Sequence, residues 1–352
     1  MKRLRRGTLI AGGILLLSGL LLLLTAALLP RPLQSQRQAE RWAGESGQRF
    51  RQLSALPTAG QEVTPETILT FRNTAAEKLE KADLGYPAER ALCDAWSQGG
   101  TVKVAGARGS FEAAGLAVGG RFFDFHPLAL RSGGYLSEGD LMKDRVVLDE
   151  QLAWLLYGSA DLAGLTVRIG DQDFVIAGVV AQPDDPFSRA VTALGPTVYL
   201  DYSARELLSP GGALCYEVVL PEPVRGFAKG VVTDSFGKLG LIVENTDRFS
   251  FASSLRRLKT IGTLGARTEA VAFPSWENAA VCAETWCALL RGLGLACLVY
   301  PVVLALLLLR RLRKGGIREA KRLCAAGREA LLELRDRGRA RALARRGKDR
   351  RD

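Results

Sequence analysis

The only histidine in the chain is His126, so any metal site or catalytic triad that uses imidazole would have to include it. A zinc site needs several cysteine, histidine or carboxylate ligands, and no such cluster surrounds it in sequence. The nearest partners for a Ser–His–Asp arrangement are Ser132, Ser137, Asp124 and Asp140, but neither serine stands in a G-x-S-x-G turn. We therefore predict no catalytic residue and no metal ligand, and interpret His126 as a loop residue with an ordinary hydrogen bond.

The sequence also lacks a phosphate-binding loop. The nearest approach is GVVTDSFGK at residues 230–238, where the first glycine lies two positions too far away and Leu239 replaces the required hydroxyl. The adjacent acids Asp184 and Asp185 precede a proline, which is typical of a turn rather than of an acid–base pair. We expect no cofactor, and this inventory argues against an enzyme.

Two apolar runs without charge, residues 8–29 and 292–309, organise the chain. A bilayer core needs roughly 20 apolar residues in a helix, so both runs are transmembrane candidates. The first run follows KRLRR and has a rival interpretation as a signal peptide. It is longer than a cleavable apolar region and no A-x-A site follows it, which favours an uncleaved anchor. Near the second run, Arg291 can extend to the membrane interface, and Pro301 is expected to kink the helix.

The net charge of +11 is unevenly distributed. Residues 1–7 carry four basic side chains, residues 310–352 carry 17 basic and 6 acidic ones, and residues 8–309 have a net charge of −4. The positive-inside rule then places both termini in the cytoplasm and the segment between the runs outside the cell (plasma) membrane. The basic ends indicate topology and attraction to anionic membrane lipid, and they do not indicate nucleic-acid binding.

Two of the six cysteines, Cys93 and Cys215, fall in the predicted outer segment. A disulfide between them is one interpretation in an oxidising compartment, and two small buried thiols are the other. No pair has C-x-x-C spacing, so a zinc or redox motif is not indicated.

Residues 134–180 carry the clearest folding pattern of the outer segment. Residues 146–148 form a short β-branched apolar run that predicts a strand. Asp149 stands where a helix N-cap belongs, and Gly158 is a natural end for that helix. The pattern is that of a packing module without catalytic residues.

Two more strands are expected at the end of this module. Residues 165–169 alternate with period two, and residues 174–180 follow a Gly–Asp turn as a nearly continuous apolar run. Val175 and Val179 are predicted to share the core-facing side of the last strand.

Helices and short strands are mixed through the rest of the outer segment, so we predict an α+β domain. Residues 34–56 are polar and helix-prone, and Thr64 with Pro65 predicts the start of a second helix, which ends near residue 83. The other expected helices are 92–96 (one turn), 224–239, 247–261 and 277–309, and the other expected strands are 101–105, 196–200, 214–220 and 241–244.

Three stretches carry a family resemblance: GRFFDF at residues 120–125, VVLDEQLAWLLYG at 146–158 and DLAGLTVRIGDQDFVIAGVV at 161–180. They resemble the extracytoplasmic core domain of MacB-type and FtsX-type ABC transporter permeases. ENTDRFS at 244–250 and SWENAA at 275–280 are similar to parts of a subgroup of such proteins. The resemblance implies a MacB-like outer domain that moves in response to a separate cytoplasmic ATPase.

Such permeases have four membrane helices per chain, and this sequence has two apolar runs. The resemblance thus implies a reduced permease subunit that works with a companion ABC ATPase, with fuller permease subunits or with a second copy of itself. A membrane-anchored binding or signalling protein without transport activity of its own is the alternative.

The expected organisation assigns every part of the chain. The basic tail is equally compatible with an amphipathic helix on the inner membrane surface and with a solvated, partly disordered segment. The predicted parts are a cytoplasmic N-terminus (1–7), a transmembrane helix (8–29), a helical stalk (30–85), the MacB-like core domain (86–250), a connector (251–286), a second transmembrane helix (287–309) and a basic cytoplasmic tail (310–352).

Overall fold

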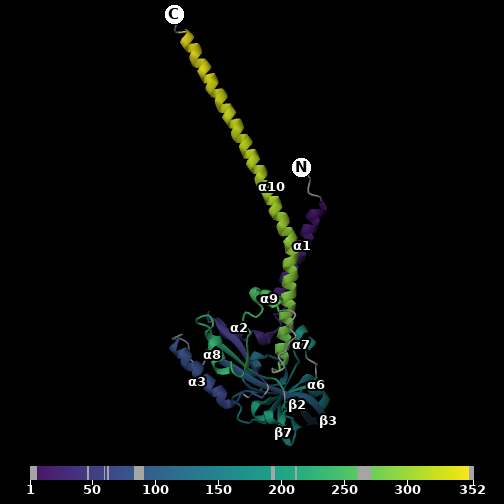
Figure 1. The fold of residues 1–352 in the computed structure, drawn as a ribbon. Coiled ribbons are helices and arrows are strands. Elements are labelled where there is room, and N and C mark those ends of the chain that lie inside the picture. Colours follow the sequence, from purple (N-terminus) through teal and green to yellow (C-terminus); the bar gives the residue numbers. More distant parts are fainter. Residues whose placement is uncertain are drawn as a thin grey trace. The chain divides into compact units, whose positions relative to one another are not determined.

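The computed structural model describes residues 6–45, 47–58, 60–61, 63–82, 91–191, 195–210, 212–260 and 271–348 (Figure 1). The chain divides into two compact units. One is Leu24–Gly292, which contains the sheet, and the other combines Met1–Leu23 with Leu293–Asp352. The α+β class and the two long apolar helices predicted from the sequence are both confirmed.

A ten-stranded sheet of order β10-β1-β9-β2-β3-β8-β5-β7-β4 forms the first unit, with β6 pairing to both β2 and β7. Because β6 joins β2 to β7, the strands β2, β3, β8, β5, β7 and β6 close into a ring, which leaves no free edge among them. The strands are β1 (Phe50–Pro57), β2 (Cys93–Gly106), β3 (Gly109–Gly120), β4 (Leu130–Gly133), β5 (Arg145–Asp149), β6 (Thr166–Ile169), β7 (Gln172–Val180), β8 (Thr197–Asp201), β9 (Leu214–Pro221) and β10 (Gly240–Glu244).

The module at residues 134–180 folds largely as its sequence predicts. Helix α6 (Glu150–Tyr157) begins where the Asp149 carboxylate accepts a 2.7 Å hydrogen bond from the Leu152 N–H. It ends at Gly158, whose left-handed φ of 74° suits a residue without Cβ. Leu152 and Leu156 pack with the inward side chains of the ring as one apolar core.

A bulge in β7 changes which side chains face that core. Val146 of β5 pairs with Ile176, but Val147 pairs with Gly178, so one residue of β7 is skipped. Ile176 and Val179 therefore both enter the core of the ring, whereas Val175 is only half-buried. The prediction is confirmed for Val179 and wrong for Val175, because the period-two assumption does not hold across a bulge.

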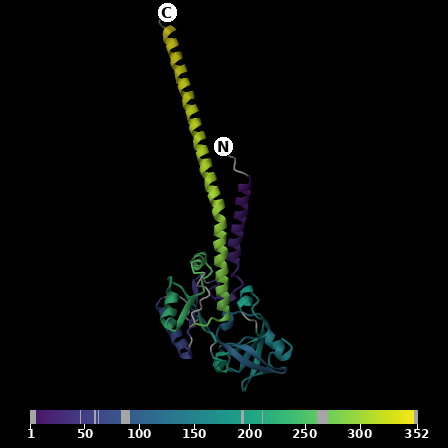
Figure 2. The same ribbon diagram turned by 45° about the vertical axis from the view of Figure 1, so that its right-hand side comes forward.

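The remaining part of the sheet, formed by β10, β1, β9 and the start of β2, is covered on one face by α3 (Pro65–Lys81) and α8 (Phe227–Phe236). Figure 2 shows both helices against this part of the sheet. Thr64 caps α3 through the Thr67 N–H, as predicted. Phe71, Tyr216 and Phe236 meet with ring centroids 4.6–5.5 Å apart, which fixes the two helices on the strands.

The opposite face is covered by α2 (Gln38–Ala43), α5 (Phe122–Phe125) and the first turns of α10 (Ser275–Lys348). Trp276 of α10 packs on Phe122 and on His126, with centroid distances of 5.8 and 4.3 Å. The start of α10 is thus part of the core of the sheet domain. The other short helices are η1 (Gln34–Gln36), α7 (Pro186–Val191), η2 (Tyr202–Leu207) and α9 (Phe251–Leu258).

The second unit contains most of α1 (Arg6–Leu28) and the apolar part of α10. Two described helices, Gly7–Leu28 and Ser275–Arg313, are long and apolar enough to cross a membrane, and each contains an 18-residue stretch with a mean hydropathy of 2.5. Glycines let the two helices approach closely: a Cβ at Gly19 would lie 2.9 Å from the Leu298 side chain, and one at Gly12 would lie 3.0 Å from Leu304.

Three element predictions need correction. Residues 34–56, in the predicted helical stalk at 30–85, end in β1, because burial of Leu53, Ala55 and Leu56 between β9 and β10 outweighs the helical propensity of the segment. The helical turn expected at 92–96 is the start of β2. The helix expected at 247–261 is shorter, since α9 covers Phe251–Leu258, and residue 261 lies outside the described residues. The predicted start of the core domain near residue 86 also lies outside the described residues.

Candidate functional site

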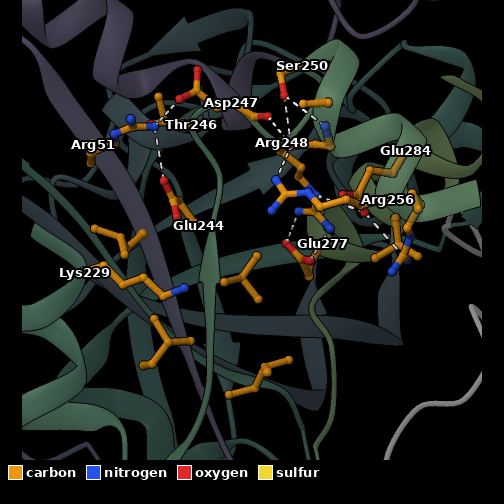
Figure 3. A pocket seen from close by; sticks show the side chains of 18 of the residues that line it. Arg51, Lys229, Glu244, Thr246, Asp247, Arg248, Ser250, Arg256, Glu277 and Glu284 are labelled. Carbon is orange, nitrogen blue, oxygen red and sulfur yellow. Dashed lines mark hydrogen bonds and ion pairs between the residues drawn. The ribbon is translucent and has the colours of Figure 1, made fainter. Parts of the chain in front are cut away.

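Arg248 joins the sheet domain to the first turns of α10 (Figure 3). Its Nη1 and Nη2 donate to the two carboxylate oxygens of Glu277 at 2.8 and 2.7 Å, and both residues are almost completely buried. Planar bidentate pairing of this kind fixes the relative orientation of two groups as well as their distance. Because Arg248 follows β10 and Glu277 begins α10, the pair locks the helix base to the sheet.

Further contacts continue this junction along α10. Arg248 Nε lies 3.3 Å from Glu284 Oε2, and Arg257 of α9 approaches the same carboxylate at 3.6 Å. About two turns later, Arg291 donates to the Ser250 carbonyl at 2.8 Å and to the Ser254 hydroxyl. The helix is therefore held to the loop before α9, and to α9 itself, over about four turns.

A hydrogen-bonded chain of buried polar groups extends from Arg248 across the sheet. Arg248 donates to Gln36 Oε1 at 3.3 Å, and the Asn245 amide donates to the same oxygen at 3.0 Å. Ser54 of β1 donates to Asn245 Oδ1 at 3.0 Å and lies 3.5 Å from Glu217 Oε1 of β9. A buried polar network of this kind is costly unless its members are paired, so these contacts hold the loop and strands in one arrangement.

This series of hydrogen-bonded polar groups ends at His126, whose Nε2 lies 2.5 Å from Glu217 Oε2. His126 lies in the loop directly after α5, as predicted, and it is buried between Phe122 and Trp276. Glu217 thus connects the group that packs on Trp276 with the chain that leads to Arg248. Both ends of the polar chain contact the first turn of α10, through Trp276 and through Glu277.

The loop between β10 and α9 is held in an unusual backbone conformation. Asp247 has φ = 61°, the one positive φ at a non-glycine residue among those described. Its carboxylate is bound by Arg51 of β1, which also reaches Glu244 at 3.1 Å and Glu222 at 3.7 Å. Arg51 therefore supports the loop that presents Arg248 to α10.

The electrostatics of the junction favour permanent charge on Arg248. Burial lowers the pKa of this guanidinium, but the ion pairs with Glu277 and Glu284 together raise it by more, so its pKa lies above the ordinary value. The carboxylates of Glu277 and Glu284 are paired with Arg248, and Arg257 also approaches Glu284. The arrangement fixes the first turns of α10 to the loop after β10.

A second buried cluster fixes α3 to the sheet. Arg72 donates to both oxygens of Asp94 at 2.8 and 2.9 Å, and the Tyr216 hydroxyl donates to Asp94 Oδ2 at 2.7 Å. The hydrogen bond to Asp94 raises the pKa of Arg72, and burial raises that of Tyr216. This cluster orients α3 and is separate from the α10 junction.

The residues considered for catalysis are dispersed in local contacts. Ser132 donates to the Ala160 carbonyl, Asp140 accepts from the Ser137 N–H, and Asp124 pairs with Arg121. Asp185 caps the start of α7 through two backbone N–H groups, as expected for a turn residue. Within the described part of the chain, no three histidine, cysteine or acidic side chains are grouped as metal ligands.

Cys93 and Cys215 are both free and buried. They lie on the paired strands β2 and β9, but Cys93 stands opposite Val219 and Cys215 opposite Ser97, so they are four positions out of register. Burial raises the pKa of Cys93 to about 12 and that of Cys215 well above its ordinary value. Of the two interpretations of this pair, the structure has the buried thiols.

The sequence indicated the two segments of the junction but not their contact. Arg248 lies in ENTDRFS and Glu277 in SWENAA, the two stretches that resemble a permease subgroup. A charge in each stretch is visible in the sequence, whereas pairing across 29 positions is not. Glu277 is the first residue of the helix predicted at 277–309, and its position there does not indicate which cation it pairs with.

Comparisons with known proteins follow the resemblance seen in the sequence. No family model and no curated protein matches the chain. The periplasmic region of MacB from Actinobacillus actinomycetemcomitans is similar at 19% identity and a TM-score of 0.39, covering 55% of this chain and 88% of that one. The extracellular domain of the noncanonical ABC-type transporter YknZ from Gram-positive bacteria is similar at 12% identity and a TM-score of 0.38, covering 56% and 99%.

The resemblance to MacB-type outer domains predicted from residues 120–180 is thus confirmed as a resemblance. The first of these structures is a periplasmic region, and the second is the extracellular domain of an ABC-type transporter. With TM-scores below 0.5, these likenesses add no weight to a functional assignment, which has to rest on the contacts of this chain.

Proposed function

We propose that this chain is a membrane-embedded, ABC transporter permease-like subunit whose extracytoplasmic domain couples to substrate or partner proteins. The observation that carries the proposal is the buried bidentate pair between Arg248 and Glu277. It makes the base of α10 an integral part of the sheet domain, and the same helix continues into the apolar run at residues 292–309. A tilt or shift of the helix would therefore move the domain with it.

The proposed layout follows the charge distribution. Residues 1–7 and 310–352 are cytoplasmic, residues 8–29 and 287–309 cross the membrane, and residues 30–286 lie outside with the core domain at 86–250. The subunit is non-catalytic, and a companion ABC ATPase drives it. Membrane lipid, other permease subunits and a second copy of the chain are its further partners.

The alternative is a membrane-anchored binding or signalling protein that uses the same rigid connection. In that case the outer domain would sense a ligand or envelope partner and pass the movement inward to the basic tail. The two functions differ in one respect, namely whether an ATPase binds the chain.

Co-purification in a mild detergent tests the proposal. The full chain, tagged at its C-terminus, is expected to bring down an ABC ATPase from cells of its own source. A chain with Glu277→Gln serves as a control for the junction, because it lacks the rigid connection but keeps both apolar helices. If the folded wild-type chain purifies without ATPase or permease subunits, the transporter function is contradicted and the binding or signalling function is favoured.

A further inference from the structure

A cavity of about 1050 Å³ lies beside the Arg248–Glu277 junction (Figure 3). Its walls come from the edge of the sheet at β1 and β10, from the start of α8, from α9 and from the first turns of α10. A cavity of this size would admit a charged headgroup rather than only water.

All the acidic side chains that line this cavity are paired, but some of its basic side chains are not. Its acids are all engaged, because Arg51 pairs with Glu222, Glu244 and Asp247, while Arg248 pairs with Glu277 and Glu284. Three further cations line the same cavity and form no ion pair with any described residue: Arg225, Lys229 and Arg256. All three are exposed, and Arg256 makes one side-chain hydrogen bond, to Ser253. The cavity therefore offers free positive charge and no free carboxylate.

Helix α9 forms one wall of this cavity and contacts α10 close to the first residue of the apolar run. Arg291 is bonded to Ser250 and Ser254, and a Cβ at Gly292 would lie 3.1 Å from the Leu258 side chain. Gly292 is the first residue of the uncharged run, so α9 lies beside the point where that run begins. The Phe251 ring on α9 is 48% exposed, and aromatic residues favour the membrane–water interface.

We infer that this cavity binds an anionic phospholipid headgroup, whose phosphate pairs with one of the unpaired cations of its walls, Lys229 or Arg256. The inference rests on the membrane placement in the proposed function, but it needs no ATPase. Lipid phosphate at the interface carries the negative charge that would pair with these cations, and lysine and arginine both bind phosphate. A lipid bound there would contact α8 and α9 together, next to the helix base that carries the domain.

Native mass spectrometry of the full chain released from detergent tests this site. Phosphatidylglycerol or phosphatidylcholine is added in increasing amounts to the wild type, to Lys229→Ala/Arg256→Ala and to the matched control Lys103→Ala/Lys238→Ala. The control removes two exposed lysines that lie outside the cavity. Circular dichroism verifies that all three chains are folded, and the basic ends contribute equally to lipid binding in each.

We expect the wild type and the control to bind phosphatidylglycerol alike, and the cavity variant to bind it about tenfold more weakly. Phosphatidylcholine should bind weakly to all three. Equal phosphatidylglycerol affinity in the cavity variant would overturn the site. Displacement of the lipid by inorganic phosphate at equal concentration would show a site for a free anion and would overturn the lipid as its occupant.

Discussion

The Arg248 guanidinium and the Glu277 carboxylate meet through two parallel hydrogen bonds of 2.7 and 2.8 Å, away from solvent. The pair connects the loop after the last strand to the first turn of the helix that runs on as an apolar segment. A buried ion pair contributes little net stability compared with apolar packing, but it is costly to break. The Arg248–Glu277 pair therefore serves to fix the orientation of the first turn of α10 relative to the loop after β10.

Removal of one partner should therefore destabilise the outer domain. Glu277→Gln leaves the buried charge of Arg248 with the 3.3 Å contact to Glu284 as its remaining ion pair, and we expect a loss of about 3–5 kcal/mol in the free energy of unfolding. Urea unfolding of the full chain in detergent, followed by tryptophan fluorescence, measures the change.

Glu150→Gln is the matched control for this substitution. Glu150 forms a 3.1 Å ion pair with Arg131 in which both side chains are well exposed, so its loss should cost less than about 1 kcal/mol. The double variant Arg248→Met/Glu277→Leu should recover most of the lost stability, because no charge is then left unpaired. Equal stability of Glu277→Gln and the wild type would contradict the role of the pair.

Substitutions in β7 test the bulge. Val179→Asp places an unpaired charge in the core of the ring and should unfold the domain, whereas Val175→Asp lies on the half-buried face and should leave it folded. Limited proteolysis distinguishes these outcomes. Rapid digestion of both variants would mean that β7 has no bulge, and resistance of both would mean that Val179 is not in the core.

The module at 134–180 was predictable because its signals are local. A carboxylate cap, a glycine end, short apolar runs and one period-two alternation identify β5, α6, β6 and β7 without knowledge of their neighbours. β1 was not predictable in this way. Its sequence, FRQLSALP, lies within a polar, helix-prone segment, and it becomes a strand because β9 and β10 pair on its two sides.

Burial, and not a disulfide bond, should determine how Cys93 and Cys215 react with a thiol reagent. At pH 7.5 the raised pKa values keep Cys93 and Cys215 as thiols, which react poorly with N-ethylmaleimide. The exposed Cys324 should be modified first. Mass spectrometry of the labelled peptides measures this order, and labelling in urea serves as the control. A Cys93–Cys215 cross-linked peptide under non-reducing conditions would contradict the free thiols.

The candidate site was only partly accessible from the sequence. His126 was predicted as a loop residue with an ordinary hydrogen bond, but its burial against Trp276 and its bond to Glu217 depend on residues about 90 and 150 positions away. The same holds for Arg248, whose partners come from η1 and α10. Residue type and spacing identify groups that need partners, and the fold decides which partners they find.

Both candidate functions require the outer domain and the basic tail to lie on opposite sides of one membrane, and labelling tests this most directly. Leu141 is 97% exposed in the outer domain, and the native Cys324 lies exposed in the tail. Sealed spheroplasts that carry the wild type or Leu141→Cys/Cys324→Ser are treated with an impermeant maleimide. We predict immediate labelling at position 141 and labelling of Cys324 only after permeabilisation. Labelling of Cys324 in sealed spheroplasts, with protection of position 141, would contradict the proposed placement.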